Sequence, residues 1–352
     1  MMEKEKSTKT KIIEDRLYFF IELVIVFIGG FFLVFIAEII TSILDPSSIL
    51  YGPLYFLIKS IIILVTVPLF LHLAYLILKD QKEENQEKFQ LSPTFGHLKL
   101  YTISRNNFKY QFLYGFLILF LIFIPLDFFT YLIPGMIEYQ AESLINPYNS
   151  LGTYFTQSYE IFIASAIIIH ISVALMEETL ARGLIAKRGS EYYNKISAVI
   201  ISSIYWGMGH LFYVIFNPIQ WGFSIIWFLQ AFFIGIILSS FIIKKKWLFP
   251  LIFAHALNNI ISAHTIWNYK QGNNFLVITI YLYVPLLIIS ILLLIWQFSR
   301  IKTAVSTGFK EFISYFKPDS KRNESGGDLG IRILFDIIMG IIIFLLGLLV
   351  SL

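Results

Sequence analysis

The chain has 352 residues, of which 57% are hydrophobic and only 14% are charged, and its mean hydropathy is +0.74. These proportions exclude an ordinary soluble domain, so we expect the lipid bilayer to be the solvent of most helices. The sequence has no cysteine, which excludes disulfides, thiolate metal sites and cysteine nucleophiles. The net charge of +4 is spread over several segments, and no basic block typical of a nucleic-acid-binding protein occurs.

Nine apolar runs are long enough, or nearly so, to cross about 30 Å of hydrocarbon as helices. They cover residues 17–44, 54–78, 111–133, 159–181, 196–216, 219–243, 247–266, 275–298 and 333–352. We therefore predict an all-α polytopic membrane protein with about nine transmembrane helices. The first run follows a basic segment, residues 1–16, but it is longer than the apolar region of a signal peptide and has no small-residue cleavage site after it. We interpret it as a retained helix.

Lysine and arginine alternate between the two sides of this nine-helix arrangement. The termini and loops carry, in chain order, 5, 0, 6, 0, 4, 0, 3, 1, 7 and 0 of these residues. Because positively charged loops stay in the cytoplasm, the N-terminus is predicted to be cytoplasmic and the C-terminus extracytoplasmic. Two long polar stretches, a loop at 80–110 and a linker at 299–330, fall on the cytoplasmic side.

Most polar residues within the predicted helices have a structural interpretation. Five lie near estimated helix ends, where long side chains reach the headgroups: Glu38, Lys59, His72, His264 and Asp336. Asp127 follows Pro125 and is assigned to backbone donors freed by a proline kink. His170 stands alone in an apolar stretch and is interpreted as an interhelical hydrogen-bonding residue.

The run at 159–181 ends in charged residues that need another explanation, because an ionised side chain at mid-helix costs roughly 2.5–3.5 kcal/mol on insertion scales. Glu178 and Arg182 are four residues apart, so they share a helix face and can pair. Glu177 is rotated by about 100° from Glu178 and has no local partner.

Two further predicted helices carry polar pairs at the same spacing. Trp206 and His210 share one face of the run 196–216, and His255 and Asn259 share one face of the run 247–266. Any single pair of this kind is more often a packing hydrogen bond than a functional site. Together with Glu177, however, these helices offer a carboxylate, two imidazoles and a carboxamide within the bilayer.

This set of groups is suited to peptide hydrolysis. A carboxylate in a low-dielectric site can deprotonate water as a general base, and an imidazole and a carboxamide can stabilise the oxyanion that follows. No Gly-x-Ser-x-Gly or His-Glu-x-x-His motif occurs. Glu177, His210 and His255 would also serve as ligands of a divalent metal such as zinc, so the sequence leaves metal-dependent catalysis open.

The three ordered motifs resemble those of the CPBP family, which includes the type II CAAX prenyl endopeptidases and related bacteriocin-processing and immunity proteins. The motifs are Glu177-Glu178-x-x-x-Arg182, Trp206-x-x-x-His210 and His255-x-x-x-Asn259, with Trp206 where the family commonly has Phe. The resemblance implies a catalytic core at 159–266, in which Glu177 activates water and His210 helps to hold it. It implies an oxyanion hole formed by His255 and Asn259, a structural role for Glu178 with Arg182, and an aromatic role for Trp206 that the change from Phe leaves almost unaltered.

The expected function is therefore intramembrane endopeptidase activity on a prenylated CAAX-type tail or another membrane-tethered peptide. Lys187 and Arg188 mark the predicted cytoplasmic end of the catalytic helix, and we expect the site to open on that side of a cell or endoplasmic-reticulum-type membrane. A proton- or ion-coupled transporter and a non-catalytic regulator of a membrane partner are the alternatives. The helices in 17–158 and in 267–352 lie outside the core, and the resemblance implies no role for them.

Overall fold

The computed structural model describes residues 8–82, 92–145, 150–211, 220–320 and 323–351, which are helical almost throughout and contain no β-strand. The longer helices are α1 (Thr8–Thr41), α2 (Tyr51–Lys82), α4 (Phe108–Ile118), α7 (Tyr159–Glu177), α9 (Lys195–Leu211), α10 (Trp221–Lys245), α11 (Phe249–Lys270), α13 (Val284–Tyr315) and α14 (Gly326–Ser351). The shorter ones are α3 (Pro93–Leu98), η2 (Lys99–Tyr101), η3 (Leu119–Phe123), α5 (Ile124–Tyr131), α6 (Met136–Leu144), η4 (Ser150–Thr156), η5 (Glu178–Arg188), α8 (Gly189–Tyr192), α12 (Phe275–Ile278) and η8 (Thr279–Tyr283).

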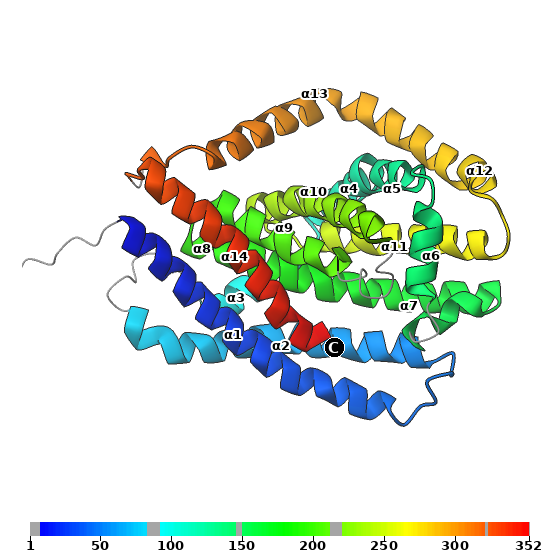
Figure 1. Ribbon diagram of the computed structural model, residues 1–352, viewed down its shortest axis with the longest axis horizontal. Coiled ribbons are helices and arrows are strands. Elements are labelled where there is room, and N and C mark those ends of the chain that lie inside the picture. The colour runs from blue at the N-terminus through cyan, green and yellow to red at the C-terminus, as the bar shows by residue number, and fades with distance from the viewer. Residues whose placement is uncertain (1–7, 83–91, 146–149, 212–219, 321–322, 352) are drawn as a thin grey trace, which may run out of the picture.

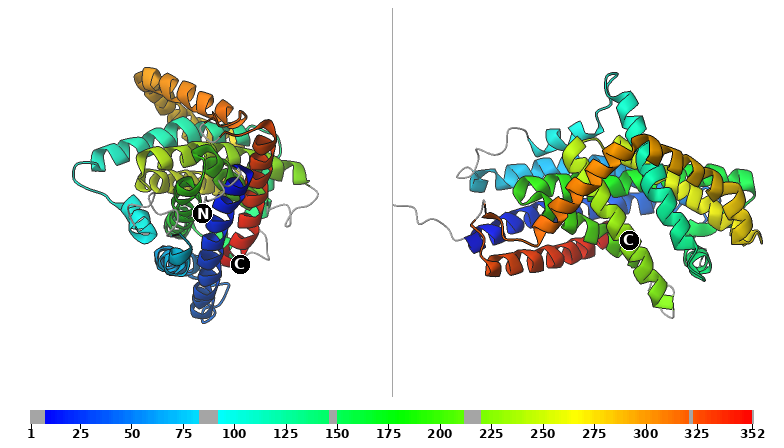
Figure 2. Two further views of the ribbon diagram at one scale, coloured as in Figure 1. Left: turned by 90° about the vertical axis from the view of Figure 1, so that its left-hand side faces the viewer. Right: turned by 90° about the horizontal axis from the view of Figure 1, so that it is seen from above.

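Most long helices run along the long axis of the molecule, with α8 at one end and α6 and α12 at the other (Figure 1). We call these the α8 end and the α6 end. The view down the bundle shows α1 and α14 next to each other and α13 along the opposite side (Figure 2). Buried apolar side chains from most of the helices form one large core in the middle of the bundle. Much of the outer surface of the helices is also apolar. This distribution is that of a protein solvated by lipid.

Seven helical segments of the described chain are long and apolar enough to cross a membrane. They are Lys9–Thr41, Tyr51–Leu78, Phe108–Tyr131, Tyr159–Tyr192, Trp221–Lys245, Phe275–Tyr315 and Gly326–Leu348. The predicted class, an all-α multi-pass membrane protein, is confirmed. The two other predicted spans correspond to α9, whose described part ends at Leu211, and to α11, which is rich in histidine and asparagine. The count of nine spans and the orientation of the termini stay predictions.

Two of the transmembrane segments contain a π-helical turn just before a proline. The turn η3 precedes Pro125, and the turn η8 precedes Pro285. Proline lacks a backbone N–H and its ring clashes with the carbonyl four residues earlier, so a widened turn relieves the clash without breaking the helix. The kink predicted at Pro125 is therefore accommodated by the backbone itself.

The cytoplasmic segments predicted from polarity contain more helix than expected. α3, η2 and the start of α4 lie within the predicted loop 80–110, and α13 continues through the first half of the predicted linker 299–330. Hydropathy falls where a helix leaves apolar surroundings, whereas its backbone hydrogen bonds continue, so α13 extends into the predicted linker as far as Tyr315. Part of the predicted basic segment, residues 1–7, lies outside the described residues.

Buried ion pairs join the outer helices to each other and to the segment that carries the motifs. Arg16 of α1 lies 2.6 Å from Asp336 of α14, and both side chains are buried. Arg188, at the end of η5, lies 2.8 Å from Glu22 of α1. The interpretation of Asp336 as a headgroup-contacting residue was therefore wrong. Its partner is 320 residues away in the chain, and no local pattern indicates it.

Candidate active site

The two adjacent glutamates lie at a change of helix type and have different surroundings. α7 ends at Glu177 and the π-helix η5 begins at Glu178. The Glu177 side chain is 37% exposed, whereas Glu178 is completely buried. The rotation between neighbouring helical residues thus gives the carboxylates separate environments, and π-helical turns of this kind occur frequently at functional sites.

Glu178 is held by two partners on different helices. Its Oε2 atom lies 3.3 Å from Nε of Arg182, and both side chains are completely buried. Its Oε1 atom lies 2.9 Å from Nδ1 of His255 on α11. The guanidinium of Arg182 also lies 4.1 Å from the centre of the Trp206 ring. The predicted pairing of Glu178 with Arg182 is present, and the contact with His255 is an addition that helix spacing could not indicate.

Glu177 lies against Trp206 and His255. The indole Nε1–H of Trp206 donates a hydrogen bond to Oε2 of Glu177, and Nε2 of His255 lies 3.8 Å from the same oxygen. A phenylalanine at position 206 could not donate this bond. The expectation that tryptophan in place of phenylalanine changes little therefore does not agree with the geometry.

His210 lies on the other side of Trp206. Their ring centres are 5.1 Å apart, and the ring centres of Trp206 and His255 are 5.5 Å apart. The Nδ1 atom of His210 lies 3.2 Å from the backbone oxygen of Trp206, one turn earlier in α9. Because a bond from Nδ1 to this carbonyl uses the ring N–H, Nε2 would carry a lone pair. The indole thus separates the two imidazoles and contacts both.

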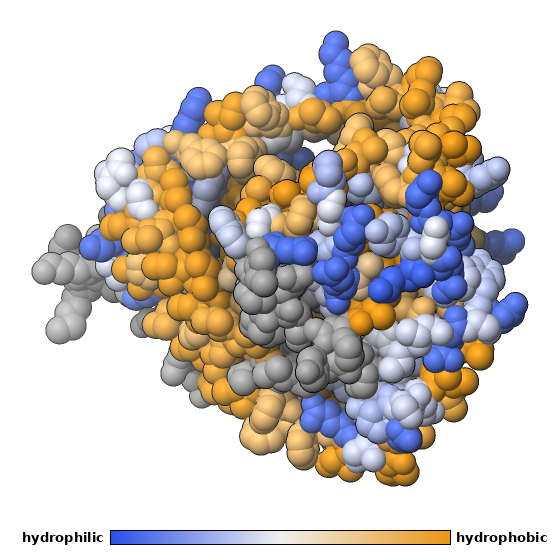
Figure 3. All heavy atoms as spheres, turned by 45° about the vertical axis from the view of Figure 1, so that its right-hand side comes forward, coloured by the Kyte–Doolittle hydropathy of each residue, from blue (hydrophilic) through white to orange (hydrophobic). Residues whose placement is uncertain are grey.

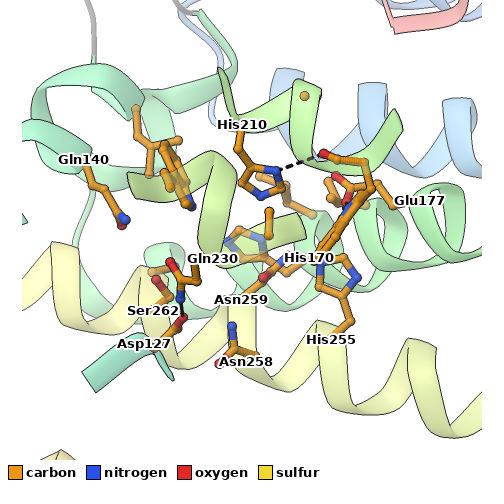
Figure 4. A pocket seen from close by; sticks show the side chains of 18 of the residues that line it. Asp127, Gln140, His170, Glu177, His210, Gln230, His255, Asn258, Asn259 and Ser262 are labelled. Carbon is orange, nitrogen blue, oxygen red and sulfur yellow. Dashed lines mark hydrogen bonds and ion pairs between the residues drawn. The ribbon is translucent and has the colours of Figure 1, made fainter. Parts of the chain in front are cut away.

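All four predicted catalytic residues line one cavity of about 540 Å³. Figure 4 shows the side chains of Glu177, His210, His255 and Asn259 around this space. Asn259 comes from α11, one turn beyond His255. The structure therefore brings together the residues that the sequence placed on three separate helices, together with Trp206.

The cavity has a second polar group that the sequence did not assign to the site. Asp127 accepts a 2.8 Å hydrogen bond from Nε2 of Gln230, and Asn258 and Ser262 line the same space (Figure 4). The interpretation of Asp127 as a cap for backbone donors was wrong, because its hydrogen bond goes to a side chain on α10. Gln230 stands in an apolar run without a motif, so the only available signal was its polarity.

His170 also lines the cavity. Its Nε2 atom lies 3.1 Å from the hydroxyl of Tyr154 in η4, so its predicted hydrogen bond to another segment is present. Tyr131 contributes a further link, since its hydroxyl donates to Oε1 of Gln140 in α6 at 2.9 Å. These bonds attach α6 and η4 to the walls of the cavity.

The proposed metal ligands do not form a metal-binding cluster. Within the residues that the structure describes, no three histidine, aspartate or glutamate side chains converge as ligands. Nδ1 of His255 is occupied by Glu178, so only Nε2 of this ring remains for a further ligand. The residues do not fit a zinc site in this arrangement.

The lining residues of the cavity bear on the predicted entrance to the site. Its lining runs from mid-bundle, at Glu177 and His255, to α6 and η4 at the α6 end. Lys187 and Arg188 lie at the α8 end, and every residue of η5 except Lys187 is buried. The lining therefore does not support an entrance on the side marked by Lys187 and Arg188.

The cavity is lined by a partly exposed glutamate and two imidazoles, and it lies inside a bundle of apolar helices. These features place the protein in the class of intramembrane proteins with an acid–base site. Residues 159–261 match the family model described as type II CAAX prenyl endopeptidase Rce1-like. This match covers α7 to α10, the first part of α11 and all three motifs. It confirms the resemblance to the CPBP family, and the Rce1-like family that matches is a family of proteases. Searches of curated proteins and of solved structures found no match.

Proposed function

We propose that the protein is an intramembrane endopeptidase that hydrolyses a peptide bond with a water molecule activated by Glu177. The observation that carries this proposal is that the adjacent carboxylates of Glu177 and Glu178 have different surroundings. One carboxylate is fixed by Arg182 and His255, and the other faces the cavity beside Nε2 of His255. Such a division leaves one carboxylate available for proton transfer.

The mechanism begins with a peptide carbonyl in the cavity and a water between it and Glu177. Glu177 accepts a proton from this water, whose oxygen forms a bond to the carbonyl carbon. Nδ2 of Asn259 would donate to the resulting oxyanion, and so would Nε2–H of His255 when this ring carries both protons, whereas the Nε2 lone pair of His210 would accept from the water. When the tetrahedral carbon collapses, the C–N bond breaks and Glu177 returns the proton to the leaving amine. The carboxylate of Glu177 is then restored, and the products are a carboxylic acid and an amine.

Trp206 would position the base in this scheme. Its indole donor holds one oxygen of Glu177 in a fixed position at the wall of the cavity. The buried contact between Glu178 and His255 would fix the orientation of the imidazole in the same way. Catalysis by positioned groups depends on such secondary contacts, because small misplacements reduce the rate strongly.

The substrate class is a peptide tethered to the membrane. The family description makes a prenylated CAAX-type tail the first candidate, and any peptide next to a lipid anchor or a transmembrane helix has the same access to an intramembrane site. The cavity of about 540 Å³ has both apolar and polar lining, which suits a peptide with an apolar attachment.

The test is cleavage of fluorogenic membrane-anchored peptides, prenylated and unprenylated, by the purified protein in detergent or liposomes. Glu177→Gln is expected to lower kcat by about 10²–10⁴-fold, the usual contribution of a general base. Glu160→Gln is the matched control, because Glu160 is exposed at the start of the same helix α7. Turnover by Glu177→Gln equal to that of Glu160→Gln would exclude the proposed mechanism.

A further inference from the structure

The cavity occupies one half of the bundle on every helix that contributes to it. On α9 the lining residues are Tyr205, Trp206, Gly209 and His210, all near its described end, and on α14 they are Phe344, Gly347 and Leu348. α10, which runs the opposite way, contributes Trp227, Gln230, Ala231 and Ile234, from its first half and middle. Helices that run in opposite directions thus contribute lining residues from the same half of the bundle. The cavity therefore lies between the middle of the bundle and the α6 end.

The other half of the bundle is filled at the level of η5. Leu184, Ile185 and Ala186 have no exposed surface, and the same is true of Leu248 at the start of α11. The loop around η2 adds to this packing, since the backbone N–H of Leu248 donates to the carbonyl oxygen of Leu100 at 2.9 Å. His97 of α3 packs closely on Gly183. A Cβ atom added to Gly183 would lie 2.8 Å from the ring of His97. A peptide approaching from the α8 end meets packed side chains.

The charges of the connecting segments indicate which side of the membrane each end faces. The segment 134–158, which contains α6 and η4, has no lysine or arginine, whereas Lys187, Arg188 and Lys195 lie together near α8. By the positive-inside rule the α6 end is extracytoplasmic. Hydrophilic residues gather on the face that appears when the α6 end is brought forward (Figure 3), as expected of a surface that meets water.

We propose that the substrate reaches Glu177 from the extracytoplasmic side, so that the peptide cleaved is the membrane-proximal part of an exported, membrane-tethered protein. This inference rests on the proposed peptidase function, and within the class of membrane-tethered peptides it favours an exported peptide over a prenylated cytoplasmic tail. Asp127, Gln230, Asn258 and Ser262 line the route. These groups suit the amides of a polar peptide better than they suit an isoprenoid chain, which contains no hydrogen-bonding group. A prenylated cytoplasmic tail would have to pass the packed η5 region.

The absence of cysteine from the natural sequence allows a direct test with single-cysteine variants. Ser262→Cys places a thiol in the cavity, Ser47→Cys places one in the exposed segment between α1 and α2, and Ser314→Cys places one on the exposed surface of α13 near its end. By the charge count, Ser47 is extracytoplasmic and Ser314 is cytoplasmic. Each variant is treated with a membrane-impermeant maleimide in intact cells, and in a second sample after lysis.

We expect intact cells to label Ser47→Cys and Ser262→Cys, and to label Ser314→Cys only after lysis. Labelling of the cavity thiol only after lysis, or in neither sample, would overturn the proposal. The reverse pattern at the two controls would also overturn it, because the α6 end would then face the cytoplasm. Labelling does not depend on turnover, so an accessible cavity thiol in a protein without peptidase activity would contradict the proposed function and leave the direction of access supported.

Discussion

The Nδ1 atom of His255 lies 2.9 Å from Oε1 of Glu178, so a residue expected only to pair with Arg182 also orients an imidazole of the site. Glu178 therefore links the catalytic helix to α11. Without it, the buried guanidinium of Arg182 would keep its charge and lose its ion-pair partner, and the ring of His255 would lose the group that fixes its orientation.

Replacement of Glu178 is expected to destabilise the fold. Removing one partner of a buried ion pair costs about 3–5 kcal/mol of unfolding free energy, so Glu178→Ala should melt at a clearly lower temperature in detergent. The control is Glu177→Ala, which removes a carboxylate whose side chain is 37% exposed and should melt close to the natural protein. Equal melting temperatures for the two variants would contradict the buried pair. Glu178→Ala/Arg182→Met should recover part of the loss.

Trp206→Phe tests whether the indole donor positions Glu177. A hydrogen bond to a charged group contributes about 1.5–3 kcal/mol, so its loss should lower kcat by about tenfold or more, with a smaller effect on KM. Trp247→Phe is a suitable control, because Trp247 packs on Tyr114 away from the cavity. A Trp206→Phe variant with unchanged kcat would mean that the aromatic surface alone matters at this position.

Removal of divalent metals is expected to leave peptidase activity unchanged. The described residues hold no cluster of three ligands, and one nitrogen of His255 is occupied by Glu178. Dialysis against a chelator followed by the cleavage assay checks this, with a known zinc peptidase treated in parallel. Activity that falls on chelation and returns on addition of zinc would show that Glu177, His210 and His255 converge on a metal in the working enzyme.

The stability of the protein should fall in mild acid because of His97. Burial lowers the pKa of His97 from 6.5 to about 4, and a backbone contact with Gly183 offsets only part of this effect. The folded protein therefore keeps this ring neutral where the unfolded chain binds a proton. Stability is complete above about pH 6.5 and is lost as the pH falls towards 4, by on the order of 3 kcal/mol.

Melting curves between pH 7 and pH 4 test the role of His97. His97→Phe, which keeps a ring of similar shape and cannot titrate, should show a smaller decrease in melting temperature over this range. The matched control is His72→Phe, since His72 lies on the exposed face of α2. If both variants keep the full pH dependence of the natural protein, the loss of stability in acid arises from other groups.

Helix periodicity and motif spacing were enough to predict which residues of three helices lie together. Glu177, His210, His255 and Asn259 meet at one cavity because each lies at a fixed position on a predicted helix face. Contacts between helices distant in the chain were not accessible in this way. The bond from Asp127 to Gln230 and the contact of Glu178 with His255 depend on how helices pack, and a single sequence carries no local signal of that.

The direction of access shows the same limit. Lys187 and Arg188 predict which side of the membrane this end of the bundle faces, but the free space in a bundle depends on where side chains from several helices fail to fill it. Here the small and apolar side chains of η5 are buried and fill the half of the bundle towards the α8 end. The half between Glu177 and the α6 end contains the cavity. The charge pattern therefore predicts the sides of the membrane, and only the packing indicates which half of the bundle holds the cavity.

The ion pair between Arg16 and Asp336 has a consequence for synthesis of the protein. These residues are 320 positions apart, so α1 enters the membrane long before its partner helix has been made. Chains are synthesised from the N-terminus at about 5–20 residues per second, so Arg16 waits for on the order of tens of seconds before Asp336 emerges. During that interval α7 to α11 are already available to assemble. Helix α14 therefore packs against α1 only after the helices that carry the motifs have been synthesised.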